Sequence, residues 1–128
     1  MATVMIVEDD LSLQRLYEMI LKSSGFHVLG KANNGEEAVR IYHENSNKLD
    51  IILMDHRMPI KNGIEATKEI LEHNIKTKII FTSADKSVRN KAIQTGAVSF
   101  LEKPFSFSDL VKEIKKILDN NNNPTVVA

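Results

Sequence analysis

The sequence lacks several features that would indicate other classes of protein. It contains no cysteine, which excludes disulfide bonds, thiolate metal sites and thiol catalysis. No apolar run approaches the roughly 20 residues that span a membrane, and no basic segment followed by a long apolar core indicates a signal peptide. The 17 basic side chains balance the 17 acidic ones, whereas a general nucleic-acid binder would normally be basic. We therefore expect a cytoplasmic protein with no membrane contact and no direct nucleic-acid binding.

The residues that are present fit one globular domain. A chain of 128 residues suits a single core, and 42% apolar with 27% charged residues are ordinary values. Strand-like apolar runs alternate five times with apolar residues at helical spacing. The expected strands are 3–7, 27–31, 50–54, 78–82 and 98–101; the expected helices are one that ends at Gly25, then 36–44, 64–73, 86–95 and a last one capped by Ser106. We expect a domain over residues 1–119 and a polar, disordered tail over 120–128.

This alternation predicts an α/β fold in which helices cover both faces of a parallel sheet. Functional sites in such sheets form at the carboxyl ends of the strands, where the strand order reverses. Polar or charged groups follow the first, third, fourth and fifth expected strands. These groups are Glu8, Asp9 and Asp10, then Asp55, then Thr82 and Ser83, and finally Glu102 and Lys103. We expect them to converge at one edge of the sheet.

Three of these acids, Glu8, Asp9 and Asp55, would repel each other at a common site. Two carboxylates about 5 Å apart cost roughly 3 kcal/mol at an effective dielectric constant near 20, so the cluster needs a cation, a proton or solvent. Oxygen ligands select a hard cation, and Mg²⁺ suits a site with few carboxylates because it keeps several waters. No pair of histidines is spaced to favour zinc. The alternative is a solvated acidic loop beside a helix N-terminus.

Lys103 and Thr82 add an ammonium group and a hydroxyl to the predicted cluster. Phosphoryl transfer to a carboxylate requires a carboxylate nucleophile, a metal, a lysine and a hydroxyl. The cations offset charge on the transferring group, and positioning does most of the catalysis. Each residue alone is a weak signal, because threonine often ends a strand and a lysine before proline is usually exposed.

Four motifs occur in order, each at an expected strand end: MIVEDD at 5–10, LMDHRMPIKNG at 53–63, IIFTSA at 79–84 and FLEKPF at 100–105. With them the chain, over residues 2–120, resembles the receiver domain of bacterial and archaeal response regulators. The resemblance implies a flavodoxin-like, doubly wound fold with five parallel strands in the order 2-1-3-4-5 and five flanking helices. It implies a phosphoacceptor switch of two-component signalling, which catalyses only its own phosphorylation and dephosphorylation.

The resemblance assigns the chemistry to particular residues. Asp55 is implied to be the phosphoacceptor, and Asp9 is implied to bind Mg²⁺ directly as one of an acidic pair with Glu8. The backbone carbonyl of Arg57 is implied to be a further metal ligand. Lys103 is implied to pair with the phosphoryl group, and its bond to Pro104 is implied to be cis.

Other residues are implied to transmit the signal. Thr82 is the expected switch hydroxyl that moves to a phosphoryl oxygen, and Phe100 is the expected aromatic that turns inward on activation. A sensor histidine kinase or a histidine phosphotransfer protein would donate the phosphoryl group. An unknown output protein would bind the face formed by residues 86–118, where the fourth helix is basic.

Some positions depart from the family pattern. His56 follows the phosphoacceptor where an apolar residue is expected, and Arg57 is large and cationic where the side chain faces the site. The last helix lacks the arginines of winged-helix transcription regulators, and residues 96–101 lack their paired acids. Their symmetric dimer is therefore not expected.

Two other functions are consistent with the same topology in principle. A flavodoxin-like enzyme would need a glycine- and hydroxyl-rich phosphate loop after the first strand, where this chain has three acids at 8–10. A phosphatase of the haloacid dehalogenase type would need its D-x-D nucleophile there, whereas the best nucleophile here, Asp55, follows the third strand. A receiver used only as an interaction module would not require the intact set of acids, hydroxyl and lysine.

Overall fold

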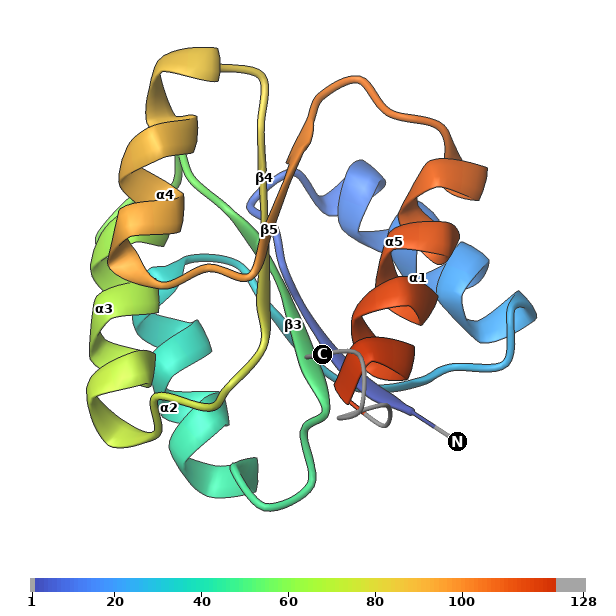
Figure 1. The fold of residues 1–128 in the computed structure, drawn as a ribbon, viewed down its shortest axis with the longest axis horizontal. Coiled ribbons are helices and arrows are strands. Elements are labelled where there is room, and N and C mark those ends of the chain that lie inside the picture. Colours follow the sequence, from blue (N-terminus) through green and yellow to red (C-terminus); the bar gives the residue numbers. More distant parts are fainter. Residues whose placement is uncertain (1, 122–128) are drawn as a thin grey trace, which may run out of the picture.

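The computed structural model describes residues 2–121, which form a five-stranded sheet between two layers of helices (Figure 1). The strands are β1 (Thr3–Val7), β2 (His27–Ala32), β3 (Ile51–Asp55), β4 (Ile79–Ser83) and β5 (Ser99–Glu102). All neighbours pair in parallel, in the order β2-β1-β3-β4-β5. The predicted parallel sheet and its strand order are therefore confirmed.

The helices divide between the two faces of the sheet. They are α1 (Leu11–Ser23), α2 (Gly35–Asn45), α3 (Gly63–His73), α4 (Arg89–Thr95) and α5 (Phe107–Asn121). Figure 1 shows α1 and α5 on one face and α2, α3 and α4 on the other. Among the described residues, none of these helices has the length and apolar character needed to cross a membrane.

The helices and strands begin and end within about two residues of their expected bounds, apart from the start of the fourth helix. The helix expected over 86–95 begins with a 3₁₀ turn, η1 (Lys86–Val88), because the Asp85 carboxylate accepts the Ser87 backbone N–H. The last helix has the predicted cap, since the Ser106 hydroxyl accepts the backbone N–H of Asp109. This helix continues past residue 119, and residues 122–128 of the predicted tail lie outside the described part of the chain.

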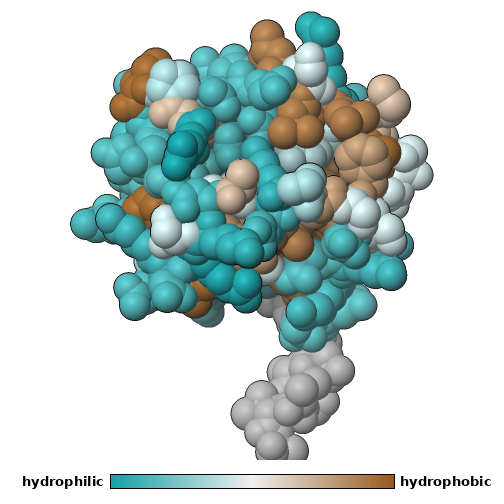
Figure 2. Space-filling model, turned by 90° about the horizontal axis from the view of Figure 1, so that it is seen from above, coloured by the Kyte–Doolittle hydropathy of each residue, from teal (hydrophilic) through white to brown (hydrophobic). Residues whose placement is uncertain are grey.

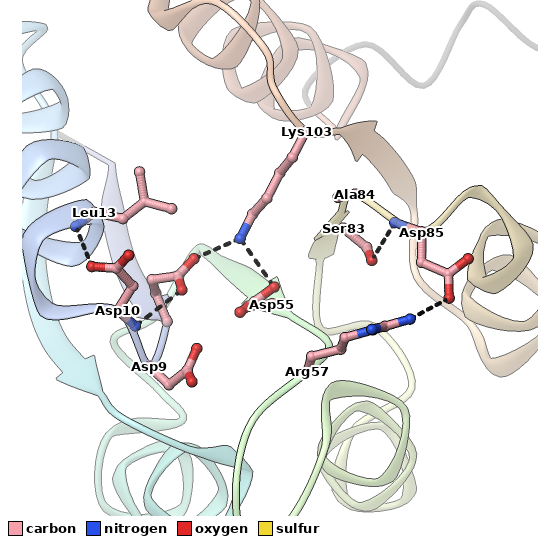
Figure 3. A pocket seen from close by; sticks show the side chains of 10 residues that line it. Asp9, Asp10, Leu13, Asp55, Arg57, Ser83, Ala84, Asp85 and Lys103 are labelled. Carbon is pink, nitrogen blue, oxygen red and sulfur yellow. Dashed lines mark hydrogen bonds and ion pairs between the residues drawn. The ribbon is translucent and has the colours of Figure 1, made fainter.

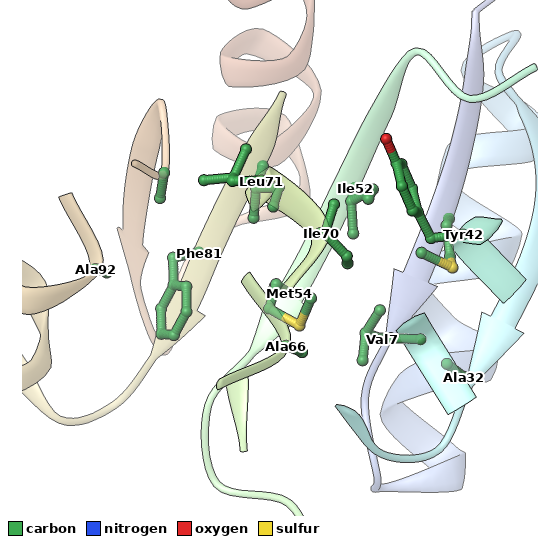
Figure 4. Packing of buried hydrophobic residues seen from close by; sticks show 14 of the residues in the cluster. Val7, Ala32, Tyr42, Ile52, Met54, Ala66, Ile70, Leu71, Phe81 and Ala92 are labelled. Atoms are coloured by element: carbon green, nitrogen blue, oxygen red, sulfur yellow. The ribbon is translucent and has the colours of Figure 1, made fainter. Parts of the chain in front are cut away.

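Strand residues alternate between two hydrophobic clusters, one on each face of the sheet. Met5 and Val7 pack in the cluster beneath α2, α3 and α4, part of which Figure 4 shows. Val4 and Ile6 pack in the cluster beneath α1 and α5. This alternation follows from the period of two along a strand. Burial on both faces explains why β3 reads as a continuous apolar run, all of it buried.

The junction between β3 and α3 is fixed by close backbone packing. A side chain at Gly63 would place its Cβ 2.1 Å from the Asp55 carbonyl oxygen, so only glycine fits there. Asn62 and Glu65 form a capping box that starts α3 at this point. The loop therefore returns tightly over the end of β3, and Asp55 is held on a rigid strand end.

Candidate functional site

The carboxyl ends of β1, β3, β4 and β5 meet around one open pocket of about 550 Å³. It is lined by Glu8, Asp9, Asp10, Leu13, Asp55, Arg57, Ser83, Ala84, Asp85 and Lys103 (Figure 3). The pocket lies beside β1 and β3, where the strand order reverses. The predicted convergence of the strand ends is therefore confirmed for the acids at 8–10, Asp55, Ser83 and Lys103, whereas Thr82 and Glu102 do not line the pocket.

Lys103 joins two acids that come from different strands. Its ammonium Nζ lies 2.8 Å from Glu8 Oε1 and 3.1 Å from Asp55 Oδ1. Both carboxylates are buried, and Glu8 is only 2% exposed. The Lys103–Pro104 bond is cis, as the resemblance implies. Lys103 thus reaches the pocket floor from the β5 side, while Glu8 and Asp55 reach it from β1 and β3.

Burial and neighbouring charges have opposite effects on the pKa values of Glu8 and Lys103. The pKa of the Glu8 carboxyl is raised to about 7, mainly because burial disfavours its charged form; the hydrogen bond from Lys103 opposes the shift and the charge of Asp55 adds to it. Burial alone would lower the pKa of the Lys103 ammonium, but the hydrogen bond and charge of Glu8 and the charge of Asp55 outweigh burial and raise it. The lysine therefore stays charged at neutral pH, and Glu8 can hold a proton when no cation is bound.

The donor set fits a hard divalent cation. Glu8, Asp9 and Asp55 each offer a carboxylate oxygen, and these oxygens lie within 4.8 Å of one another. Two of the three acids are buried and Asp9 is exposed, so the group is accessible from solvent through the pocket. Carboxylate oxygens with room for retained waters are the environment that Mg²⁺ requires. The three acids implied to form the metal site are therefore brought together.

Thr82 and Phe100 lie near the acidic pocket but do not line it. The Thr82 hydroxyl is buried and lies 3.4 Å from the Met54 carbonyl oxygen, which accepts its hydrogen bond. The half-buried Phe100 ring stacks against Phe81 at 6.2 Å between centroids, and the Arg89 guanidinium lies over it at 5.8 Å. The Thr82 hydroxyl therefore has a backbone acceptor, and Phe100 contacts Phe81 and Arg89.

The unusual residues after Asp55 have structural explanations. The His56 ring packs against Phe81 at 5.7 Å between centroids, and burial lowers the pKa of His56. A neutral imidazole therefore fills the position where an apolar residue was expected. Arg57 extends away from Asp55, and its guanidinium donates to Asp85 Oδ2 at 3.1 Å (Figure 3). The expectation that the Arg57 side chain faces the site is therefore confirmed, since Arg57 lines the pocket, but its partner there is the Asp85 carboxylate.

Gln14, which the sequence analysis did not select, and Asp10 hold the loop at the edge of the pocket in place. Gln14 is buried, and its amide donates to the Glu8 carbonyl at 3.0 Å and to Asn33 Oδ1 at 2.9 Å. Asp10 accepts the Ser12 backbone N–H and so caps α1. These contacts fix the loop that carries Glu8 and Asp9. A polar residue on the buried face of α1 was the one sequence signal that could have indicated Gln14.

An apolar depression adjoins the acidic pocket. It has a volume of about 470 Å³ and is lined by Leu13, Leu16, Tyr17, Ala84, Lys103, Pro104, Phe105 and Phe107. Figure 2 looks onto this end of the molecule, where the largest gathering of hydrophobic residues lies toward the upper right of a mainly hydrophilic face. Leu16 and Phe107 are each 37% exposed. Two pockets of opposite character therefore share one edge of the sheet.

The pocket and fold can be compared with known proteins. The family model for the response regulator receiver domain matches residues 4–115. Chemotaxis protein CheY of Thermotoga maritima is 40% identical, over 89% of this chain and 95% of that protein. CheY of Bacillus subtilis is 37% identical, over 91% of this chain and 97% of that protein. The crystal structure of the CheX-CheY-BeF3-Mg complex from Borrelia burgdorferi superposes with a TM-score of 0.88 and 27% identity, over 91% of this chain and 89% of that one.

Proposed function

Because this chain belongs to the response regulator receiver domain family of two-component signalling, we propose that Asp55 is its phosphoacceptor. The observation that carries this assignment is the Lys103 ammonium, which lies between Asp55 and Glu8 on the floor of the pocket. Asp55 is the central acid of that floor, because β3 occupies the middle of the sheet. A carboxylate held by a rigid strand can attack a phosphoryl group without losing much further freedom.

The reaction balances with Asp55 as the nucleophile. An Asp55 carboxylate oxygen forms a bond to phosphorus, and the bond from phosphorus to the donor's imidazole nitrogen breaks. The electron pair of that bond leaves with the ring nitrogen, and because the other ring nitrogen of the phosphohistidine carries a proton, the leaving group is a neutral imidazole. Lys103 pairs with the charge that gathers on the phosphoryl oxygens. When Asp55 becomes an acyl phosphate, Lys103 loses one carboxylate partner and gains the phosphoryl oxygens in its place.

We further propose that Mg²⁺ binds through Asp9, Asp55 and the backbone carbonyl of Arg57, with Glu8 beside them. Bound Mg²⁺ supplies positive charge that offsets the charge of the transferring group. The clustering of three carboxylates supports these ligands. Asp9 is the exposed member of the cluster, and it keeps a side of the site open to waters.

The signal would leave the site through Thr82 and Phe100. A phosphoryl group adds strong acceptor oxygens, so the Thr82 hydroxyl can exchange its Met54 acceptor, at 3.4 Å, for a better one. That movement would vacate space on the β4 side for Phe100. The face formed by residues 86–118 would then change its fit to an output protein. Receiver domains are signalling switches, and the catalysis proposed for this chain is limited to its own phosphorylation and dephosphorylation.

The phosphodonor would be a sensor histidine kinase or a histidine phosphotransfer protein in the cytoplasm. Its phosphohistidine has to enter the acidic pocket, so the donor must cover the adjoining apolar depression as well. Burial of exposed side chains such as Leu16 and Phe107 would then contribute to binding. An enzyme with an external substrate is not favoured, because the acids of the first loop would repel a phosphate compound that lacks a metal.

Acetyl phosphate labelling followed by intact mass measurement tests the phosphoacceptor. With Mg²⁺ the parent protein should gain one phosphoryl group, and Asp55→Asn should gain none. Asp119→Asn, which changes an exposed aspartate on α5, is the matched control and should be labelled like the parent. Equal labelling of Asp55→Asn would reject the assignment.

A further inference from the structure

The Arg57–Asp85 ion pair joins two loops across the rim of the phosphorylation pocket. Arg57 lies after β3 and Asp85 after β4, and both residues line the pocket. The guanidinium reaches Asp85 Oδ2 at 3.1 Å, and the two side chains are 79% and 30% exposed. An exposed pair of this kind is weak. A change of charge inside the pocket can therefore compete with it.

Asp85 also controls how the next helix begins. Its Oδ1 accepts the backbone N–H of Ser87 at 2.9 Å and the Ser87 hydroxyl at 2.6 Å, while its own backbone N–H donates to Ser83 Oγ at 3.0 Å. The two contacts with Ser87 start the 3₁₀ turn that leads into α4. The contact with Ser83 ties Asp85 to the end of β4. A displacement of the Asp85 carboxylate therefore also displaces the N-terminal end of α4.

Phosphorylation changes the charge to which Arg57 responds. The cations among the pocket-lining residues are Lys103 and Arg57. Lys103 is already bound to Glu8 and Asp55. A phosphoryl group replaces the single negative charge of Asp55 with about −1.5 to −2 and presents oxygens suited to a guanidinium. Arg57 then has two competing acceptors, the Asp85 carboxylate and the phosphoryl group.

We propose that the Arg57–Asp85 ion pair is a latch of the unphosphorylated state, which a phosphoryl group on Asp55 opens by attracting Arg57. The released Asp85 carries the change to η1 and the start of α4, beside the route through Thr82 and Phe100. The latch rests on the proposed phosphorylation of Asp55 and adds a way in which it is regulated. It gives Arg57 two roles, since this residue holds the resting state and stabilises the phosphorylated one.

Asp85→Asn opens the latch with little other change, because asparagine caps a helix as well as aspartate does. The probe is beryllofluoride with Mg²⁺, titrated while backbone amides are followed by NMR. Asp85→Asn should tighten beryllofluoride binding about two- to five-fold, the range of one exposed ion pair. In an Arg57→Gln background the same change should have no effect, because the latch is already open.

A second readout is independent of the ligand. Without beryllofluoride, the amide shifts of residues 85–92 in Asp85→Asn should move part of the way toward their beryllofluoride-bound positions. Asp10→Asn is the matched control: Asp10 also lines the pocket and caps a helix, but no contact with Arg57 is present. Its effect on binding should be the same with Arg57 and with Gln at position 57.

The outcomes separate the latch from the proposed function. If Asp85→Asn tightens binding equally in both backgrounds, simple repulsion by Asp85 explains the effect and the latch is rejected. If Asp85→Asn leaves both affinity and amide shifts unchanged while the parent binds normally, the latch is likewise rejected. If the parent shows no Mg²⁺-dependent beryllofluoride binding, the proposed function and the latch are overturned together.

Discussion

At the scale of single residues, Lys103 sets the charge balance of the pocket. Glu8 and Asp55 are both buried, and two buried carboxylates without a partner would be too costly to keep ionised. One lysine serves both, at 2.8 Å and 3.1 Å. Asp9 has no such partner in the described structure and is left to solvent or a cation. The resting pocket is thus short of positive charge, and this shortage is what a divalent cation would correct.

The first prediction is that Mg²⁺ affinity rises as pH increases through about 7. The folded-state pKa of Glu8 is raised from 4.5 to about 7, so Mg²⁺ binding must displace a proton below that pH. In the metal-free protein, the contribution of Glu8 to stability is present below pH 4.5 and is lost as pH rises through about 7. Calorimetry in two buffers of different ionisation enthalpy measures the released proton.

Glu8→Gln should bind Mg²⁺ with little dependence on pH between 6 and 8 and should release no proton. Glu36→Gln, which changes an exposed acid in the first turn of α2, serves as the control and should behave like the parent. The same proton release from Glu8→Gln and the parent would show that another group titrates.

At the scale of elements, the site depends on how closely α3 follows β3. Gly63 lies against the Asp55 carbonyl and the His56 Cα, and its own N–H donates to the His56 carbonyl at 2.9 Å. The intervening loop contains Ile60 at a φ of 71°, a backbone conformation that is rare for a β-branched residue. These contacts tie the start of α3 and the loop to the end of β3, and they hold the Asp55 backbone in place.

The second prediction concerns these contacts. Gly63→Ala should destabilise the protein by about 1–3 kcal/mol, as expected for overpacking against backbone, and it should also slow labelling of Asp55 by acetyl phosphate. Gly25→Ala is the control, because Gly25 has a φ of 92° and open space around its Cβ position. It should cost about 1–2 kcal/mol in strain with an unchanged labelling rate. Equal labelling rates in both variants would show that Asp55 does not depend on the close contact.

At the scale of the whole molecule, the strand order places the acids together at a cost to stability. β1 and β3 are neighbours although α1, β2 and α2 separate them in the chain. Their ends bring Glu8, Asp9 and Asp55 within 4.8 Å, and the fold tolerates this repulsion because two apolar clusters support the sheet. Sites built to bind are often destabilising when empty.

The last prediction follows from that cost. Asp55→Asn and Asp9→Asn should each raise the metal-free melting temperature, because each removes one negative charge from the cluster. Mg²⁺ should stabilise the parent by about 1.4 kcal/mol at roughly ten times its Kd, and Asp9→Asn should largely lose this response. Thermal unfolding at constant ionic strength, with Ca²⁺ and a non-coordinating salt as controls, measures both effects. The same Mg²⁺ shift in Asp9→Asn and the parent would exclude Asp9 as a ligand.

The sequence by itself determined the elements and the chemical groups at their ends. Apolar runs such as β3 and helical spacing are local patterns, because burial on a strand or a helix repeats with a short period. Asp55 could be selected because it ends the most apolar run, whereas the reason for glycine at Gly63, its close approach to the Asp55 carbonyl, is visible only in the folded chain. The four motifs then supplied the roles that spacing alone could not.

Only the tertiary structure decided which partner each polar side chain has. Arg57 pairs with Asp85, a residue 28 positions away, and the neutral ring of His56 packs on Phe81. Lys103 reaches Glu8 across 95 positions. Ion pairs and hydrogen bonds act over a few ångströms, and the folded sheet alone sets which loops come that close. A sequence pattern can therefore predict which charged residues lie at one edge of the sheet. The distances between their side chains determine which charges neutralise each other.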